Sequence, residues 1–161
     1  RLSRCQFIAV GMGDAALQKG FAALERRNPR SVSFRPAFDD SFAHRLYAAC
    51  DLFLMPSRFE PCGLGQMIAM RYGAVPVASR TGGLADTVIE SGQRPNGFLA
   101  PPGDAADLAR ALDRALDRFA APHWNNLSAA AMQGDFSWER SIALYLDVYR
   151  RARASKAAVP R

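Results

Sequence analysis

One carboxylate, Glu60, stands between an apolar run and a glycine-containing run in the segment 56–66, which reads PSRFEPCGLGQ. If the apolar run is a strand of a parallel sheet, Glu60 lies at its carboxyl end, where such sheets bind their ligands. An anion there, close to the start of a helix, can stabilise positive charge that develops on a sugar ring or hold the hydroxyl groups of the sugar. Taken alone, however, the segment favours a structural interpretation in which Glu60 only caps the helix.

Two glycine-containing segments could bind the phosphate groups of a nucleotide. Residues 11–14, GMGD, and residues 80–87, RTGGLADT, each follow a strand-like run and precede a helix-like run. Glycines let backbone N–H groups approach a ligand closely, and a helix N-terminus favours anions. In the first segment a tight turn is an equally good interpretation, and Ala16 stands where a dinucleotide-binding motif requires a third glycine. A nicotinamide cofactor is therefore disfavoured, and we expect no cofactor.

Strand-like and helix-like runs alternate along the chain. The predicted strands are residues 5–10, 31–34, 51–55, 74–79 and 97–100. The predicted helices are residues 14–27, 39–50, 63–72, 81–90, 105–120, 125–132 and 137–154. This alternation predicts an α/β fold, a Rossmann-like doubly wound parallel sheet in which the loops after neighbouring strands face one crevice. We expect one domain over residues 1–154 and a flexible tail over residues 155–161.

Composition and charge exclude several classes of protein. Hydrophobic residues make up 49% of the 161 residues and charged residues 22%, as in soluble globular proteins, and no apolar run approaches the ~20 residues that cross a bilayer. The net charge of +6 comes without a nucleic-acid-binding motif, so we expect no binding to nucleic acid or membrane. Cys5, Cys50 and Cys62 match neither a disulfide framework nor a zinc site, which predicts reduced thiols, no metal and a cytoplasmic protein. Residues 1–9 lack a secretory signal, and we expect the chain to begin within a longer protein.

Four strings in the sequence resemble the C-terminal domain of bacterial glycogen synthases and plant starch synthases. They are PSRFEPCGL at 56–64, RYG at 71–73, RTGGLADTV at 80–88 and DFSW at 135–138. The resemblance implies that the chain is the C-terminal half of a two-domain GT-B fold. In that family this half binds ADP-glucose, or less often UDP-glucose, and the enzyme transfers glucose to the end of an α-1,4-glucan with retention of configuration. The resemblance implies no metal, because basic side chains and helix N-termini stabilise the leaving diphosphate in this fold.

The resemblance also assigns roles to individual residues. Glu60 would be the catalytic residue, which holds the glucosyl ring near its 3-hydroxyl and supports the charge of an oxocarbenium-like transition state. Phe38 would stack on adenine in place of the tyrosine that is common in the family. The donor-binding residues are then Gly11, Gly13, Phe38, Cys62, Gly63, Leu64, Arg80, Thr81, Gly82 and Gly83.

Two further positions, 68 and 65, bear on which members of the family the chain resembles. Ile68 stands where related transferases with an E-x7-E motif carry a second glutamate, which favours a glycogen or starch synthase over a retaining transferase with another nucleotide-sugar donor. Gly65 stands where the synthases often have threonine. A non-catalytic nucleotide-binding module is the third interpretation, and the retained Glu60 argues against it.

The family's N-terminal domain carries a lysine-containing glycine loop, a histidine and most of the acceptor surface, and no such segment is present in these 161 residues. We therefore expect the chain to bind its donor weakly and not to complete catalysis alone, with the α-glucan acceptor bound mainly through the missing domain. In the family the last helix crosses towards that domain. Part of the stripe formed by Ile142, Tyr145, Leu146 and Tyr149 would then be exposed here, and two copies could form a dimer through it.

Overall fold

The computed structural model describes residues 2–157, with side chains described as far as residue 154. Its strands are β1 (Phe7–Val10), β2 (Val32–Arg35), β3 (Leu52–Met55), β4 (Val75–Ser79) and β5 (Phe98–Ala100). Its helices are α1 (Ala15–Arg27), α2 (Asp40–Ala49), α3 (Gly65–Arg71), α4 (Gly82–Thr87), α5 (Ala105–Phe119), α6 (Trp124–Met132) and α7 (Trp138–Ala157). All strand pairs are parallel, and the predicted α/β class is confirmed.

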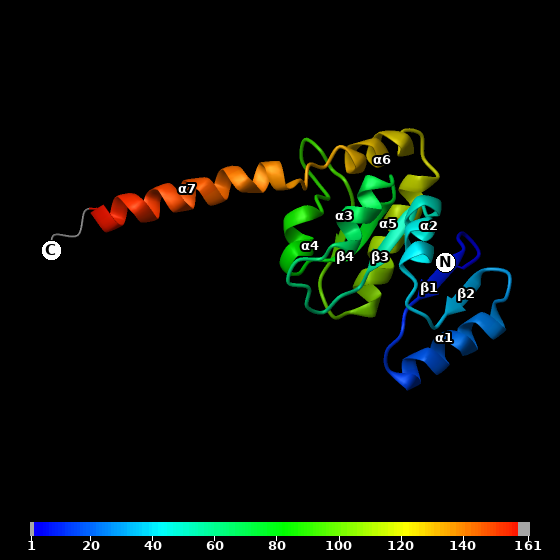
Figure 1. Cartoon of the computed structure of the whole chain (residues 1–161). Helices are drawn as coiled ribbons and strands as arrows, with labels where there is room; N and C mark the ends of the chain where they lie inside the picture. Colours follow the sequence, from blue (N-terminus) through cyan, green and yellow to red (C-terminus); the bar gives the residue numbers. More distant parts are fainter. Residues whose placement is uncertain (1, 158–161) are drawn as a thin grey trace.

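Three strands form the centre of the molecule, in the order β3-β4-β5. Leu52 pairs with Val75 between β3 and β4, and Val77 pairs with Phe98 between β4 and β5. Every residue of β4 is buried, because helices cover both faces of this sheet (Figure 1). Parallel strands end at the same edge, so the loops after β3 and β4 come out side by side.

The core is divided between the two faces of this sheet. On one face, Val77 and Ala100 pack against Ala111 and Ala115 of α5. On the other face, the buried cluster comprises Ala78, Leu84, Val88 and Leu99, two of which come from the sheet and two from α4 and its end. Small alanines on the α5 side allow that helix to lie close to the strands, which fixes the sheet between two layers of helices.

The first two strands form a sheet of their own. The sequence predicts one continuous sheet, whereas in the described part of the chain β1 pairs only with β2. Phe21 of α1 stacks on Phe7 of β1 and on Phe34 of β2, with ring centroids 6.3 and 5.3 Å apart. The β1-α1-β2 unit therefore packs its aromatic side chains against itself, and Figure 1 shows it in blue at one edge of the molecule.

Aspartates stand at the start of three helices. Asp14, Asp39 and Asp104 are the N-cap residues of α1, α2 and α5, and each carboxylate accepts a hydrogen bond from a backbone N–H of the first turn. These caps satisfy N–H groups that have no partner inside the helix.

Helix α4 ends at Thr87, earlier than the predicted residue 90. The side chain of Asn96 replaces hydrogen bonds of the helix at this point. Its Nδ2 donates to the Thr87 carbonyl at 3.1 Å, and its Oδ1 accepts from the Ile89 N–H at 2.7 Å. A residue from a later segment thus ends the helix.

Helix α7 projects from the body of the molecule (Figure 1). Trp138, Ile142, Tyr145, Leu146 and Tyr149 are exposed along it, which confirms the predicted exposure of the stripe. The helix continues to Ala157, into the segment predicted as a tail, and residues 158–161 lie outside the described part of the chain. None of the helices within residues 2–157 combines the length and the apolarity needed to cross a membrane.

Candidate functional site

The loop that carries Glu60 and the glycine turn at 81–83 touch each other. The Gly83 N–H donates a hydrogen bond to the Glu60 carbonyl, with 3.0 Å between nitrogen and oxygen. The two segments follow neighbouring parallel strands, β3 and β4, so they lie at the same edge of the sheet. The predicted proximity of these two loops is confirmed.

Two glycines make this contact sterically feasible. A Cβ at Gly82 would lie 2.0 Å from the Glu60 carbonyl oxygen, and a Cβ at Gly83 would lie 1.9 Å from the Cys62 carbonyl oxygen. Gly82 also has a φ of +41°, which L side chains rarely adopt. The pair of glycines is therefore required by the close approach of two backbones, whatever ligand binds there.

Glu60 does not cap the helix that follows it. The N-cap of α3 is Leu64, and no side chain in the described part of the chain makes the cap hydrogen bond. Glu60 itself is half-buried, and its Oε2 accepts from the Ser57 hydroxyl at 3.4 Å. The structural interpretation of Glu60 as a helix cap is therefore wrong, and the carboxylate is available for another role.

Two residues that the sequence analysis missed lie between the loops. Gln66 in the first turn of α3 is fully buried, and its Nε2 donates to the Gly63 carbonyl at 2.7 Å and to Thr87 Oγ1 at 3.1 Å. The Thr87 hydroxyl donates in turn to the Gly83 carbonyl at 2.7 Å. Gln66 could have been recognised from the sequence as a polar residue on the buried side of a predicted helix, because buried amides normally have specific hydrogen-bond partners.

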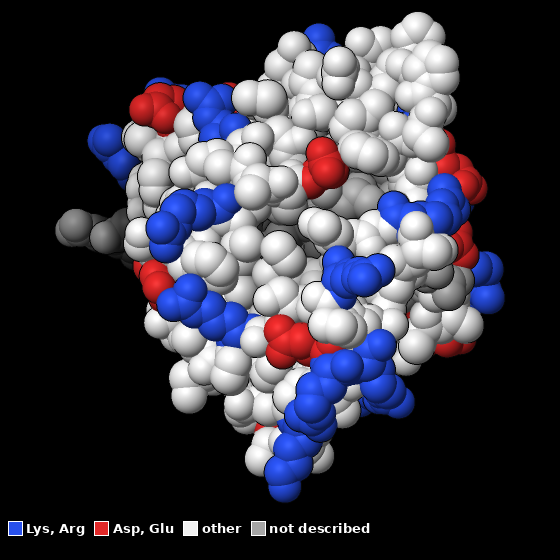
Figure 2. All heavy atoms as spheres, turned by 90° about the vertical axis from the view of Figure 1, so that its right-hand side faces the viewer, with Lys and Arg blue, Asp and Glu red and all other residues white. Residues whose placement is uncertain are grey.

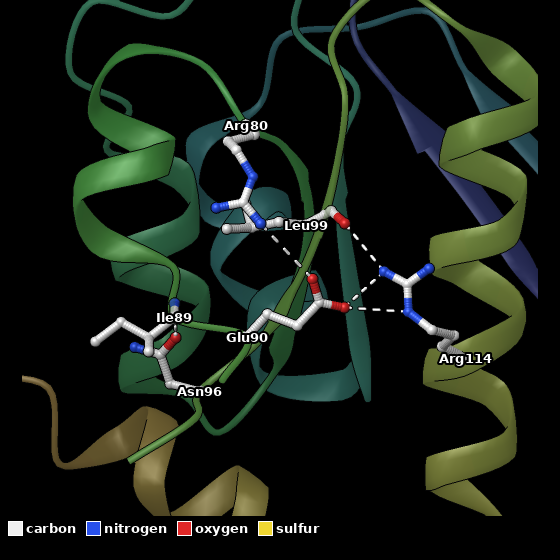
Figure 3. A network of polar contacts seen from close by, with 6 residues as sticks. All are labelled: Arg80, Ile89, Glu90, Asn96, Leu99 and Arg114. Atoms are coloured by element: carbon white, nitrogen blue, oxygen red, sulfur yellow. Dashed lines mark hydrogen bonds and ion pairs between the residues drawn. The ribbon is translucent and has the colours of Figure 1, made fainter. Parts of the chain in front are cut away.

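Arg80 lies beside an ion pair that joins α5 to the segment after α4 (Figure 3). Glu90 Oε1 accepts from Nε and Nη2 of Arg114 at 3.1 and 2.6 Å, and Arg114 also donates to the Leu99 carbonyl at 3.0 Å. Arg80 Nη2 lies 3.9 Å from Glu90 Oε2. Arg114 is thus the tightly held partner of Glu90, whereas the exposed guanidinium of Arg80 is held more loosely.

The first glycine segment and Phe38 belong to the β1-α1-β2 unit and not to the sheet that carries Glu60. Asp14 Oδ1 accepts from the Ala16 and Leu17 N–H groups at 2.8 and 3.0 Å, so the chain's own carboxylate occupies the first turn of α1. This geometry is that of a tight, capped strand-to-helix turn. The Phe38 side chain, in the loop after β2, is 90% exposed.

Packing explains the glycine at position 65. A Cβ there would lie 3.2 Å from the Phe53 ring and 3.5 Å from the Tyr47 hydroxyl oxygen. The rings of Tyr47 and Phe53 contact each other, with centroids 5.2 Å apart, and burial raises the pKa of the Tyr47 phenol. These two aromatic side chains fill the space that a larger residue at 65 would need.

Of the remaining predicted residues of the Glu60 loop, Gly63 is buried, whereas Cys62 and Leu64 are exposed. Cys62 is exposed, and Leu64 lines a pocket of about 590 Å³ between α3 and the segment that joins α6 to α7. Across residues 2–157, no three histidine, cysteine or acidic side chains are grouped closely enough to hold a metal ion. Figure 2 shows basic side chains in several places among acidic and uncharged ones, with the largest group of them at the lower edge of the view.

Parallel α/β sheets with glycine-containing loops at the ends of neighbouring strands are typical of domains that bind nucleotides. The family model described as "Glycosyl transferases group 1" matches residues 1–118, and the chain belongs to this family. Its fold matches that of GT-B glycosyltransferases, so the predicted fold class is confirmed.

Individual similar proteins show which enzymes of this family the chain resembles. The chain is 45% identical over 151 residues to the glycogen synthase of Syntrophotalea carbinolica, which covers 91% of this chain and 31% of that protein. The catalytic domain of starch synthase IV from Arabidopsis thaliana, solved with ADP and acarbose, is 30% identical with a TM-score of 0.79 and covers 92% of this chain and 38% of that one. Anabaena Alr3699/HepE, solved with UDP-glucose, is 28% identical with a TM-score of 0.64 over 91% of this chain and 43% of that one. The resemblance to glycogen and starch synthases is confirmed, and the chain spans about a third of the length of the curated relatives it matches.

Proposed function

We propose that this chain is the donor-binding part of a retaining glucosyltransferase of the glycogen and starch synthase type, which transfers glucose from ADP-glucose to the end of an α-1,4-glucan. The observation that carries the proposal is the hydrogen bond from the Gly83 N–H to the Glu60 carbonyl. It joins a loop that bears a carboxylate to a glycine turn. A sugar nucleotide needs both within a short distance, an anion beside the sugar ring and hydrogen-bond donors around the diphosphate.

In this proposal Glu60 acts on the glucosyl ring. The bond between C1 and the diphosphate oxygen breaks, and the ring gains positive charge that the carboxylate stabilises. The 4-hydroxyl oxygen of the acceptor forms the new bond to C1 on the same face, and its proton leaves with the ADP product. The hydrogen bond from Ser57 to Glu60 Oε2 at 3.4 Å would help orient the carboxylate.

The turn at 81–83 would hold the diphosphate. The Gly83 N–H is already used by the Glu60 carbonyl, so we assign the contact to the Thr81 hydroxyl and the Gly82 N–H. Thr81 makes no side-chain cap to α4, and Gly82 is exposed. Arg80 would add a positive charge after moving away from Glu90, to which it is only loosely paired at 3.9 Å.

Transfer from a different nucleotide sugar is the second candidate. The similarity to a protein solved with UDP-glucose favours it, as does the exposed Phe38 ring, which offers stacking to any base and no hydrogen bond that would select adenine. In either case the α-glucan or other acceptor would bind mainly through a part of the protein outside this chain. We place the reaction in the cytoplasm, where cysteine thiols stay reduced.

The test is an activity measurement on a chimera in which this chain replaces the matching part of the Syntrophotalea carbinolica glycogen synthase. We expect glucose transfer from ADP-glucose to glycogen, lowered about 100-fold or more by Glu60→Gln, because the carboxylate acts on transition-state charge. Glu139→Gln, an exposed change on α7, is the matched control and should leave the rate unchanged. Full activity in Glu60→Gln would contradict the role of Glu60, and a chimera that uses only UDP-glucose would favour the second candidate.

A further inference from the structure

We propose that Gln66 and Thr87 are positioning residues that tie the Glu60 loop to the glycine turn at 81–83. The inference rests on the proposed function, because the tie keeps the Glu60 carboxylate at a fixed distance from the groups assigned to the diphosphate. Neither residue touches the ligand in this assignment. Both act through the two loops that they join.

Gln66 binds the backbone of the Glu60 loop through hydrogen bonds from its side chain. Its side chain is fully buried, and Nε2 donates to the Gly63 carbonyl at 2.7 Å, with the Cys62 carbonyl at 3.4 Å. The same nitrogen donates to Thr87 Oγ1 at 3.1 Å, at the end of α4. One amide group therefore connects the backbone of the Glu60 loop to the helix that begins in the glycine turn.

Thr87 completes the connection. Its hydroxyl accepts from Gln66 and donates to the Gly83 carbonyl at 2.7 Å, which a hydroxyl can do at once with one hydrogen and two lone pairs. The Gly83 N–H then donates to the Glu60 carbonyl at 3.0 Å. Hydrogen bonds thus run from the Glu60 loop through both side chains to Gly83, and directly back from Gly83 to Glu60.

One atom of the buried Gln66 amide is unfavourable for stability. Among the described residues, its Oε1 is buried with no hydrogen-bond partner. An unpaired buried oxygen costs stability, whereas an apolar side chain of similar size, such as methionine, would fill the space without it. The position is therefore better explained by the hydrogen bonds of Nε2 than by packing.

The loops also need a tie because they meet through glycines. Gly82 and Gly83 allow the close approach but have no side chains that could interlock with the facing loop. A single backbone hydrogen bond between the loops leaves them free to pivot. The side-chain path through Gln66 and Thr87 is a second attachment, and two attachments fix the orientation as well as the distance.

The test compares Thr87→Val with Thr87→Ser in the 161-residue chain by nuclear magnetic resonance titration with ADP-glucose and, separately, with AMP. Valine keeps the shape of threonine without the hydroxyl, and serine keeps the hydroxyl. We expect Thr87→Val to raise the Kd for ADP-glucose about tenfold and the Kd for AMP less than about twofold, because AMP lacks the glucose and the second phosphate that span the two loops. Thr87→Ser should bind both ligands as the original chain does.

Gln66→Met is the second variant of the test. Its affinity for ADP-glucose and its unfolding temperature are both measured, so that an effect on the site can be told from an effect on folding. We expect it to lose affinity for ADP-glucose like Thr87→Val, because it removes the Nε2 hydrogen bonds to Gly63 and Thr87, and its unfolding temperature shows how much of the loss comes from folding. Equal ADP-glucose affinity in Thr87→Val and Thr87→Ser would overturn the inference, and so would an equal loss for AMP and ADP-glucose. If the original chain binds no ADP-glucose at all, the proposed function falls, and this inference falls with it.

Discussion

The two parts of the chain that carry predicted donor-binding residues are packed in different ways. The Glu60 loop and the turn at 81–83 stand on a sheet whose central strand is buried throughout, and hydrogen bonds join them. Gly11, Gly13 and Phe38 stand on the β1-α1-β2 unit, whose helix α1 has no fully buried residue along its whole described length. The contact between the two loops is thus already formed in the free chain, whereas the segment assigned to the base depends on an exposed ring.

This difference predicts how the two parts respond to change. A site whose groups are held in place by packing loses function when the packing is disturbed, because little rearrangement can compensate. A site on an exposed unit tolerates substitution in stability and responds only in affinity. Substitutions in both parts test this comparison.

The largest effect is expected for Gly83→Ala. Its Cβ would lie 1.9 Å from the Cys62 carbonyl oxygen, a clash with backbone that no side-chain rotation relieves, so we expect the free energy of unfolding to fall by about 3 kcal/mol or more. The matched change on the other part is Gly20→Ala in α1, where a Cβ meets nothing within 4 Å. It should raise stability by about 0.5–1 kcal/mol through helix propensity. Urea unfolding measures both, and a loss of similar size in the two variants would break the comparison.

A smaller loss is expected for Gly65→Thr. The new side chain would press on Phe53 at 3.2 Å and on the Tyr47 hydroxyl at 3.5 Å, and overpacking of this kind should cost about 2 kcal/mol. Phe53→Leu in the same chain makes room and should recover part of the loss. Thermal unfolding of the single and double variants checks this, and strictly additive effects would show that the two positions do not compete for space.

Phe38→Ala should change affinity and not stability. The ring is 90% exposed, so its removal should alter the free energy of unfolding by less than about 0.5 kcal/mol. Loss of a stacking partner should weaken ADP binding about tenfold in a nuclear magnetic resonance titration. Leu17→Ala, another exposed apolar side chain of the same unit, is the control and should bind ADP normally. Unchanged affinity in Phe38→Ala would contradict the assignment of the base-binding site to the β1-α1-β2 unit.

The smallest effects concern two ion pairs. Glu90→Gln breaks the contact with Arg114, and because both groups are partly exposed we expect a loss of only about 0.5–1 kcal/mol that shrinks at high salt. Asp117→Asn breaks the more exposed pair with Arg4, which links the segment before β1 to α5. Its loss should be less than about 0.5 kcal/mol. A larger loss for Asp117→Asn in chemical denaturation would mean that the β1-α1-β2 unit is held more firmly than its packing indicates.

Local signals in the sequence predicted most of the fold. The helices capped by Asp14, Asp39 and Asp104 begin at or next to their predicted first residues, because an N-cap depends on neighbouring residues only. The order of strands and glycine turns likewise placed Glu60 and Gly83 at one edge of a parallel sheet. Topology was sufficient for that expectation, since parallel strands end together.

Contacts between distant segments could not be predicted in the same way. The early end of α4 depends on Asn96, which comes from the segment before β5. The hydrogen bond between Gln66 and Thr87 joins two helices, α3 and α4. No sequence pattern around either residue indicates that the other is its partner. The alternation of strands and helices along the chain also fits either one sheet or two, so it could not predict that β1 and β2 pair apart from β3, β4 and β5.

The most direct test of the central claim follows the backbone N–H signals of residues 60–64 and 81–83 while the 161-residue chain is titrated with ADP-glucose. If the two loops form one site, both sets of signals move with a single dissociation constant, and Glu60→Gln weakens the response of both. Signals that move in only one loop, or in the two loops with different dissociation constants, would contradict the account.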